Sequence, residues 1–409
     1  MTRPTHLILH EQDPRPVDTT APGPHPVQPP PLSLYVHYPW CVKKCPYCDF
    51  NSHTQRAGTD PAALESAYID ALIADLAAAA ATLESKRVDT VFFGGGTPSL
   101  MSAAALTRLM QAIDCHLDLA PDAEITLEAN PGTFEAERFR AYRAAGINRL
   151  SIGVQSFNDN QLQRLGRIHS GDEACRAIEI ATTHFERVNL DLMYALPAQT
   201  VTEAMQDLER AIAFGTEHLS CYHLTLEPNT AFYRQPPPLP DDDSAADMQE
   251  GIEARLGAAG FEHYETSAFA RAGAQCRHNL NYWQYGDYLG IGAGAHGKLS
   301  TGTAIVREMR HKHPQRYLEN AASGRFVQQR HSVPADELPF EFMMNALRLS
   351  DGVPAELFQA RTGLPPETIS PQLQSARAQG LLEAEETMHK PSAHGRRFLN
   401  DLLTLFLDV

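Results

Sequence analysis

Strand-like and helix-like stretches alternate along the chain from residue 32 to about residue 260, and this alternation limits the fold more than any other feature. Short apolar runs typical of strands fall at 33–38, 89–94, 124–130, 149–156, 187–195 and 218–226. Longer stretches with helical character fill the intervals at 61–84, 102–116, 134–145, 171–184, 200–214 and 244–259. Six successive β-α units predict an α/β fold with a parallel sheet and right-handed crossovers, either open or curled into a partial barrel.

Four of the predicted strands carry polar side chains on one face and apolar side chains on the other. The polar positions are Thr126, Glu128 and Asn130; Ser151, Gly153 and Gln155; Asn189 and Asp191; and Cys221, His223 and Thr225. A parallel sheet covered by helices on both sides has strands that are almost continuously apolar. A single carboxylate in this pattern would be explained if it were only a hydrogen-bonded group at the end of a strand. The repeated pattern predicts instead a curled sheet with helices outside and a polar ligand cavity inside.

Three cysteines, Cys41, Cys45 and Cys48, follow the first predicted strand with C-x3-C-x2-C spacing. They lie on the loop at the C-terminal end of that strand, where α/β folds place their chemistry. A [4Fe–4S] cluster takes one ligand per iron, so three local thiolates leave one iron open to an outside ligand. Packing alone is a poor explanation for three thiols within eight residues. The alternative is a structural zinc site with His37 or His53 as its fourth ligand.

The composition excludes several other classes of protein. Only three of the seven cysteines are clustered, which argues against a disulfide framework and predicts a reducing cytoplasm. The start, MTRPTHLILHEQDPRP, lacks the apolar segment of a signal peptide. No uncharged apolar run reaches the ~18 residues of a membrane span, and Asp75 interrupts the most apolar predicted helix. The net charge of −16 argues against nucleic acid as the main partner.

Shifts in composition divide the chain into four predicted parts. Residues 1–31 contain nine prolines and are expected to form a flexible tail. The barrel occupies 32–260, and residues 261–333 add further strands to it. Residues 334–409 read as a separate helical domain with a hairpin near 381–392, a winged-helix-like arrangement. Because winged-helix domains often bind DNA, that arrangement makes a DNA-binding regulator one possible class of function. The negative net charge argues against DNA binding.

The motifs of the barrel together resemble the radical S-adenosylmethionine superfamily. The resemblance is carried by the C-x3-C-x2-C loop, GGGTP at 94–98, EANP, GVQSF, GRIH and NLDLMYALP. It implies that Cys41, Cys45 and Cys48 bind a [4Fe–4S] cluster whose fourth iron is chelated by S-adenosylmethionine. The implied contacts of S-adenosylmethionine are Tyr35, Tyr47, Gly95, Gly96, Thr97, Glu128, Gln155, Arg167 and Asp191. A cationic sulfonium ligand would also account for carboxylates inside the cavity.

Within this superfamily the chain is similar to the oxygen-independent coproporphyrinogen III dehydrogenases and their relatives, the HemW-type haem chaperones. The dehydrogenases carry a further cysteine two residues after the third cluster cysteine, whereas this chain has Phe50. The element HNLNYW, from His278 to Trp283, resembles the HemW type. The resemblance therefore implies a protein that binds haem and delivers it to an acceptor protein, and the alternative is oxidative decarboxylation of coproporphyrinogen III.

Haem binding requires an axial ligand and an apolar, aromatic wall. His278, Tyr282 and Trp283 supply both within six residues, so we take His278 as the candidate ligand, with His296, His311 and His313 as alternatives. The competing interpretation is that His278 and its neighbouring asparagine only hold a loop together. The acceptor protein is not identified by the sequence, which permits a peripheral contact with a membrane haem protein.

Overall fold

The computed structural model describes residues 23–407 except 27, 55–57, 59 and 134–135. The strands of the main sheet are β1 (Leu32–Tyr38), β4 (Arg87–Gly95), β5 (Asp118–Ala129), β6 (Arg149–Gln155), β7 (Arg187–Tyr194), β8 (His218–His223), β9 (Glu262–Glu265), β10 (Ala268–Ala270), β11 (Asp287–Ile291), β12 (His296–Ser300), β13 (Ile305–Arg310) and β14 (Val327–Ser332). Two small pairs are formed by β2 (Trp40–Cys41) with β3 (His53–Thr54) and by β15 (Val353–Pro354) with β16 (Met388–His389).

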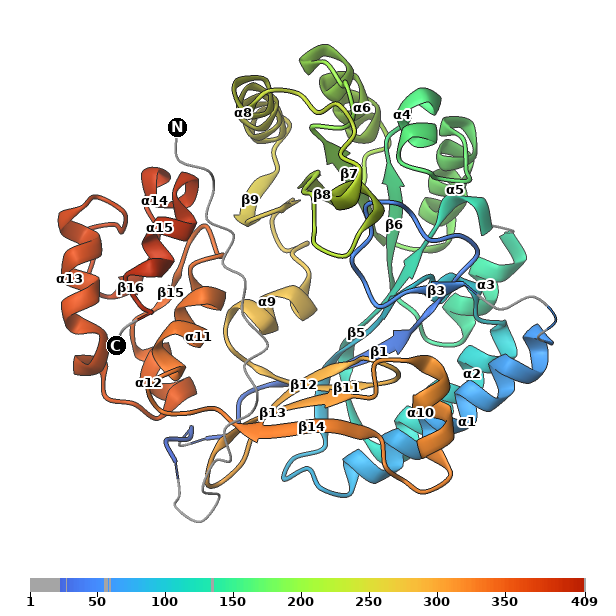
Figure 1. Ribbon diagram of the computed structural model, residues 1–409, viewed down its shortest axis with the longest axis horizontal. Helices are drawn as coiled ribbons and strands as arrows, with labels where there is room; N and C mark the ends of the chain where they lie inside the picture. The colour runs from blue at the N-terminus through green and yellow to red at the C-terminus, as the bar shows by residue number, and fades with distance from the viewer. Residues whose placement is uncertain (1–22, 27, 55–57, 59, 134–135, 408–409) are drawn as a thin grey trace.

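The main sheet has the order β14-β13-β12-β11-β1-β4-β5-β6-β7-β8-β10-β9. Strands β1, β4, β5, β6, β7 and β8 are parallel and adjacent in chain order, which confirms the predicted series of six β-α units. Among the described residues, β14 and β9 end the sheet on its two sides, so the barrel is open (Figure 1). The curled parallel strands surround a central space, as the polar faces predicted.

Helices cover the outer face of the curled sheet (Figure 1). Those of the barrel are α1 (Pro61–Ala80), α2 (Ala103–His116), α3 (Ala136–Ala144), α4 (Asp159–Arg164), α5 (Gly171–His184), α6 (Val201–Ala213), α7 (Ala231–Arg234) and α8 (Asp242–Ala258). Capping boxes fix where two of them begin, because Ser170 with Glu173 and Thr200 with Glu203 satisfy the first free N–H groups. None of the described helices combines the length and the apolar character needed to cross a membrane.

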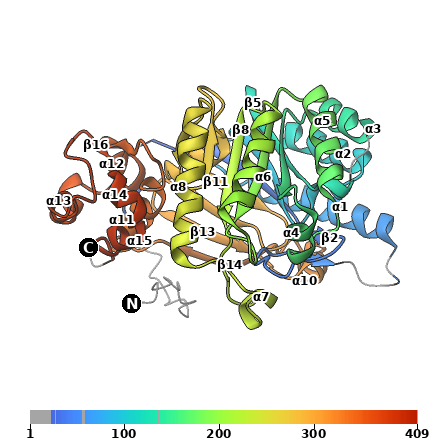
Figure 2. The ribbon, with the colours of Figure 1, turned by 90° about the horizontal axis from the view of Figure 1, so that it is seen from above.

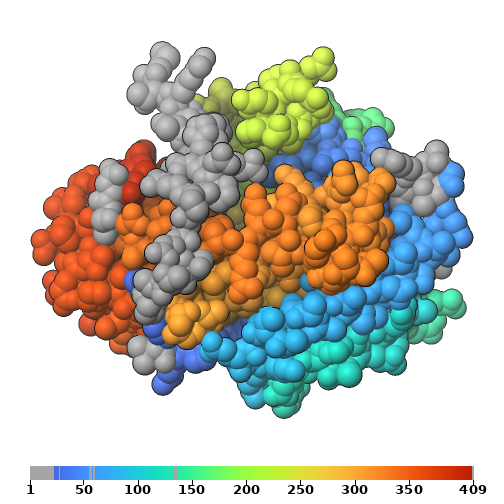
Figure 3. All heavy atoms as spheres, turned by 60° about the horizontal axis from the view of Figure 1, so that its bottom comes forward, coloured from blue at the N-terminus to red at the C-terminus, as the bar shows by residue number. Residues whose placement is uncertain are grey.

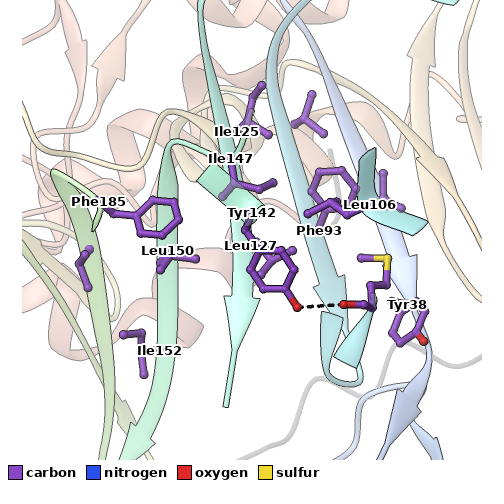
Figure 4. Packing of buried hydrophobic residues seen from close by; sticks show 14 of the residues in the cluster. Tyr38, Phe93, Leu106, Ile125, Leu127, Tyr142, Ile147, Leu150, Ile152 and Phe185 are labelled. Atoms are coloured by element: carbon purple, nitrogen blue, oxygen red, sulfur yellow. Dashed lines mark hydrogen bonds between the residues drawn. The ribbon is translucent and has the colours of Figure 1, made fainter. Parts of the chain in front are cut away.

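The apolar strand faces form the main core against these helices. Leu127, Leu150 and Ile152 are fully buried between strands and helices (Figure 4). Tyr142 of α3 lies in the same core, where its hydroxyl donates to the carbonyl of Met101 at 2.9 Å. This packing holds the opposite, polar strand faces toward the central space.

The predicted orientation of the last barrel strand was wrong by one residue. In the parallel register, Asn189 pairs with His218 and Asp191 pairs with Ser220. Ser220 therefore shares the inner face with Asp191, while Cys221 is buried in the main core. His223 and Thr225 do reach the cavity, but they lie at or beyond the end of the strand.

The segment after the barrel closes one side of the molecule. It contains α9 (Arg277–Trp283), strands β11 to β14 and α10 (Pro314–Ala321). In the space-filling view the strands and α10 lie against α1 (Figure 3). The described part of the N-terminal segment is attached to this side, since Asp287 N donates to Pro31 O at 2.9 Å and Gly23 N to Thr303 O at 2.8 Å. Residues 1–22, where most of the predicted tail falls, lie outside the described residues.

The C-terminal residues build a second core beside the barrel (Figure 2). Its helices are α11 (Leu338–Ala346), α12 (Glu356–Thr362), α13 (Ser370–Ala378), α14 (Ala393–Arg397) and α15 (Leu399–Thr404). Leu382 bridges to Pro391 and β15 pairs with β16, which gives the small sheet expected of a winged-helix-like unit. The exact division of the chain at residues 31, 260 and 333 remains a prediction.

Candidate cofactor site

The cysteine loop is seated on the glycine-rich turn that follows β4. Gly96 N donates to Tyr38 O at 2.8 Å, and Thr97 N donates to Trp40 O at 2.9 Å. A Cβ atom at Gly96 would lie 2.7 Å from the backbone of Pro39 and Trp40, so only glycine fits there. The turn and the pairing of β2 with β3 fix both ends of the loop that carries the three thiols.

Each of the three cysteine sulfurs has a polar side chain beside it, and these three side chains come from different segments. The Thr97 hydroxyl donates to Cys41 Sγ at 3.5 Å, and Arg167 Nη1 donates to Cys45 Sγ at 3.8 Å. The hydroxyl of Ser52 lies 3.6 Å from Cys48 Sγ. Such donors stabilise negative sulfur and tune a bound iron–sulfur cluster. The donor set therefore fits a cluster held by three thiolates.

The zinc alternative lacks a fourth ligand. His37 Nε2 donates to Asn51 O at 2.9 Å, and its Nδ1 accepts from the Tyr35 hydroxyl at 3.1 Å. His53 Nε2 is bonded to the side chain of Asn51 at 3.0 Å. Within the described ranges, no three Cys, His, Asp or Glu side chains are gathered closely enough to hold one metal ion. Tetrahedral zinc needs that convergence, whereas a [4Fe–4S] cluster binds each thiolate through a separate iron.

A cavity of about 440 Å³ extends from the cysteine loop into the barrel. Eleven of the predicted site residues line it, namely Cys41, Cys45, Tyr47, Cys48, Gly95, Gly96, Thr97, Glu128, Gln155, Arg167 and Asp191. Tyr35 and His278 are not in this lining. Tyr35 lies behind the glycine turn, where its ring packs on Phe92 and its hydroxyl donates to His37. The structure thus brings most of the predicted set to one place.

Two half-buried carboxylates, Glu128 and Asp191, face this cavity. Burial raises the pKa of Glu128 to about 8, and the negative charge of Asp191 raises it further. The hydrogen bond that Gly95 N donates to Glu128 at 3.2 Å lowers the pKa. Burial also raises the pKa of Asp191, although Ser151 Oγ and Asn189 Nδ2 donate to its carboxylate at 3.0 and 2.8 Å. A cavity with this electrostatic character favours a cationic ligand.

Gln155 occupies an unusual backbone conformation at the cavity wall. Its φ of 67° lies in the left-handed region, which L residues other than asparagine and aspartate seldom adopt. It terminates β6, directly before the turn into the next helix. Strain of this kind is concentrated where a side chain must be aimed at a ligand.

Arg167 is one of the cations that line the cavity. Its guanidinium donates to Gly153 O at 2.8 Å and to the side chain of Asn130, in addition to Cys45 Sγ. Neutral carbonyl oxygens thus hold the guanidinium in place, and no carboxylate forms an ion pair with it among the described residues. An anionic group of a ligand would find this charge beside the cysteine loop.

His278 lies below the floor of the cavity and is hydrogen-bonded on both ring nitrogens. Nδ1 is bonded to Thr90 Oγ1 at 2.7 Å and Nε2 to the Tyr282 hydroxyl at 3.2 Å, and the ring stacks on Phe92. The residue is 1% exposed, and burial lowers the pKa of its imidazole to about 3. Asn281 of the same helix donates to Ser33 Oγ and Asp287 O. This geometry argues against His278 as an axial ligand and for the role of holding α9 against the sheet.

We therefore expect His278→Ala to reduce stability by about 2–4 kcal/mol, because it removes two buried hydrogen bonds and leaves a cavity. The haem spectrum of the variant should equal that of the wild type. Urea unfolding and the Soret band measured on one preparation check both statements. His296→Ala, at an exposed position of β12, is the control and should change stability by less than about 0.5 kcal/mol. A shifted Soret band at unchanged stability would contradict this assignment.

Several cavity residues were missed by sequence reasoning. Arg149, His218, Ser220, Tyr222 and Asn279 line the cavity, and Ser52 contacts a cysteine sulfur. His218 and Ser220 would have been found from the correct register of β8 with β7. Arg149 carried no local signal, because it begins a strand, whereas Asn279 belongs to the HNLNYW element, which was interpreted as a haem site and not as part of this cavity.

Comparisons with known proteins agree with this fold and site. Residues 35–211 match the family model of the radical SAM superfamily, and residues 333–398 match the HemN C-terminal domain. The solved structure of coproporphyrinogen III oxidase HemN from Escherichia coli superposes with a TM-score of 0.78 at 24% identity, covering 92% of this chain and 90% of that one. At this identity the likeness shows the fold alone. The fold and the cysteine loop thus place the chain in the class of radical SAM proteins.

Two relatives show to which family of radical SAM proteins the chain belongs. The haem chaperone HemW of Escherichia coli (strain K12) is 50% identical over 380 residues, which cover 92% of this chain and 98% of the relative. The haem chaperone HemW of Haemophilus influenzae is 48% identical over 384 residues, with coverage of 92% and 98%. The chain belongs to the HemW family of haem chaperones.

Proposed function

We propose that this protein is a haem chaperone that binds haem, a [4Fe–4S] cluster and S-adenosylmethionine, and delivers the haem to an acceptor protein. The observation that carries the cofactor part is the set of three thiols, each with its own polar neighbour, at the mouth of a carboxylate-lined cavity. The names of the relatives support the haem part. The acceptor is a protein that takes up haem in the cytoplasm or at a membrane surface, and nucleic acid is not among the proposed partners.

In this proposal the chain's own residues bind and orient the cofactors. Cys41, Cys45 and Cys48 would hold three irons, and the cluster, when bound, supplies a redox-active iron with one open position. Gly95 and Gly96 form part of the cavity wall, and both must be glycine because a Cβ atom would collide with His37 at the first and with the backbone of Pro39 and Trp40 at the second. Glu128 and Asp191 supply negative charge to a cationic ligand, and Arg167 supplies positive charge to a carboxylate. Tyr47, Thr97 and Gln155 line the remaining wall.

The raised pKa of Glu128 makes binding of a cationic ligand dependent on pH. Below pH 8 the folded protein holds a proton on Glu128 that a cation must displace, so affinity for S-adenosylmethionine should rise about tenfold between pH 6.5 and 8.5. Glu128→Gln should bind S-adenosylmethionine more weakly at pH 8.5 and lose most of this pH dependence.

The stability of the cofactor-free protein should depend on pH in the opposite direction and fall between pH 4.5 and 8, because the folded state retains a proton on Glu128 that the unfolded state releases. Equilibrium binding and thermal unfolding at several pH values check both slopes. Identical profiles for the wild type and Glu128→Gln would refute this role.

The alternative function is oxidative decarboxylation of coproporphyrinogen III, and Phe50 argues against it. Phe50 is 62% exposed at the cavity mouth, at the position where the dehydrogenases that the chain resembles have a further cysteine. We expect no conversion of coproporphyrinogen III to protoporphyrinogen IX by the reconstituted protein under reducing, anaerobic conditions with S-adenosylmethionine. Product analysis against the cysteine-free variant tests this. Turnover above that background would assign the protein to the dehydrogenases, whereas cleavage of S-adenosylmethionine alone would leave the chaperone function standing.

A further inference from the structure

Large apolar side chains are exposed around the mouth of the cavity. Phe50 is 62% exposed and Tyr222 is 41% exposed, and both line the cavity. Val42 and Ile168, 60% and 54% exposed, are sequence neighbours of the lining residues Cys41 and Arg167. Single exposed apolar residues are ordinary, but a group of them around a cavity marks a binding surface.

The two lining rings come from different parts of the sheet. Phe50 belongs to the cysteine loop, between β2 and β3, which follows β1. Tyr222 belongs to β8, which is separated from β1 in the sheet by β4, β5, β6 and β7. The same lining contains the cations Lys43 and Arg167 and the carboxylates of Asp49 and Glu227. The mouth is therefore an apolar opening with charged groups of both signs at its edge. We call Phe50, Tyr222 and Lys43 the lip.

The size of the cavity limits what it encloses. A volume of about 440 Å³ lies near the lower end of the range that suits one small-molecule ligand. In the proposed function, the carboxylate-lined interior accommodates the cationic S-adenosylmethionine. A second ligand as large as haem then has no room inside and binds outside the enclosed space.

We propose that haem docks on the lip, with one face of its apolar ring against Phe50 and Tyr222 and a propionate directed to Lys43. This inference rests on the proposed function and adds a location to it. A flat apolar ring with an anionic edge matches two exposed aromatic rings beside a cation. The proposal also moves the haem away from α9, whose histidine is buried and hydrogen-bonded on both nitrogens.

The lip also offers an imidazole to the haem iron. His223 directly follows Tyr222, is exposed, and lines the cavity, with its ring edge-on to Tyr194 at 5.3 Å. Histidine is a common axial ligand of haem iron. Among the histidines that line the cavity, His218 is instead buried at its floor, where both ring nitrogens are bonded to Asn189 and Tyr264. His223 is therefore the ligand that this location assigns.

The test is a haemin titration of the full-length protein carrying its reconstituted cluster. Phe50→Ser should raise the Kd for haem about tenfold, and Phe50→Ser with Tyr222→Ser about 100-fold, while iron and sulfide content stay at the wild-type level. His223→Ala should shift the Soret band. Phe398→Ser is the matched control, because Phe398 is 47% exposed on the C-terminal domain, and its haem affinity should equal that of the wild type.

The outcomes separate this inference from the function on which it rests. A wild-type protein that binds no haem would overturn the proposed function itself. Wild-type haem affinity in the Phe50/Tyr222 double variant would overturn the lip as the haem site while the function stands. An unchanged Soret band in His223→Ala would overturn the assignment of the iron ligand. Because Phe50 and Tyr222 are exposed, misfolding is not expected, and the iron content of each variant verifies it.

Discussion

Replacing Cys41, Cys45 and Cys48 together by alanine should leave the protein with no bound iron, whereas the wild type reconstituted anaerobically should hold about four irons per chain. The three thiols are the sulfur donors of the cysteine loop, and each is already paired with a polar neighbour suited to a thiolate. With the loop held by Gly96 and by the pairing of β2 with β3, the variant should fold normally. Iron and sulfide analysis with absorption spectra is the measurement.

The remaining cysteines provide the control for this result. Cys115 is exposed on α2, and its replacement by alanine should leave the iron content unchanged. Addition of S-adenosylmethionine should perturb one iron of the wild-type cluster and have no effect on the triple variant. Iron retained by the triple variant, or zinc in the wild type with spectra insensitive to reductant, would contradict the assignment of the cysteine loop.

Arg310→Ala should cost about 3–5 kcal/mol, a large part of the stability of a typical protein. Arg310 of β13 is 2% exposed and forms ion pairs with Asp75 of α1 at 3.0 Å and Glu308 at 2.7 Å. Asp75 also accepts from the Tyr317 hydroxyl at 2.9 Å, and burial raises its pKa while Arg310 lowers it. Removing the guanidinium leaves the buried carboxylate of Asp75 without its cation. It also takes one of two cations from Glu308, which keeps Arg330 at 3.4 Å, and it loosens the contact between the barrel and the segment after it.

Urea unfolding of the variant beside a surface control measures this cost. Arg316→Ala removes an exposed ion pair with Glu319, in which the arginine side chain is 74% exposed, and should change stability by less than about 0.5 kcal/mol. A loss below about 1 kcal/mol for Arg310→Ala would show that the buried network contributes little. Lowering the pH should restore part of the lost stability of the variant, because burial raises the pKa of Asp75 and protonation removes its uncompensated charge.

The barrel was predictable because its strands and helices follow simple periodicities. The alternation of polar and apolar residues located the inner face of three strands, and Glu128, Gln155 and Asp191 all line the cavity. In β8 the same rule failed, because Leu224 and Leu226, which lie beyond the end of the strand at His223, were counted in the alternation. Only the pairing with β7 reveals the true face.

Contacts between distant segments were beyond the reach of the sequence. The HNLNYW element combines a histidine with aromatic residues, which suggested a haem ligand, but its orientation depends on Thr90, 188 positions away. Asp75 was visible as a charge in an apolar helix, yet its partner Arg310 lies 235 positions further on. The exposed rings at the cavity mouth were likewise not predicted as a group, because only the curvature of the sheet brings Phe50 and Tyr222 to the same cavity.

Haem transfer from one defined sample tests the central claim most directly. Protein purified and reconstituted anaerobically is analysed for iron, sulfide and haem, loaded with haem, and then mixed with an excess of an apo haem protein. We predict about four cluster irons and one haem per chain. The haem should pass to the acceptor, as seen by the acceptor's Soret band, while the cluster irons remain bound. A protein that holds its cluster but binds no haem, or that retains haem in the presence of excess acceptor, would contradict the account.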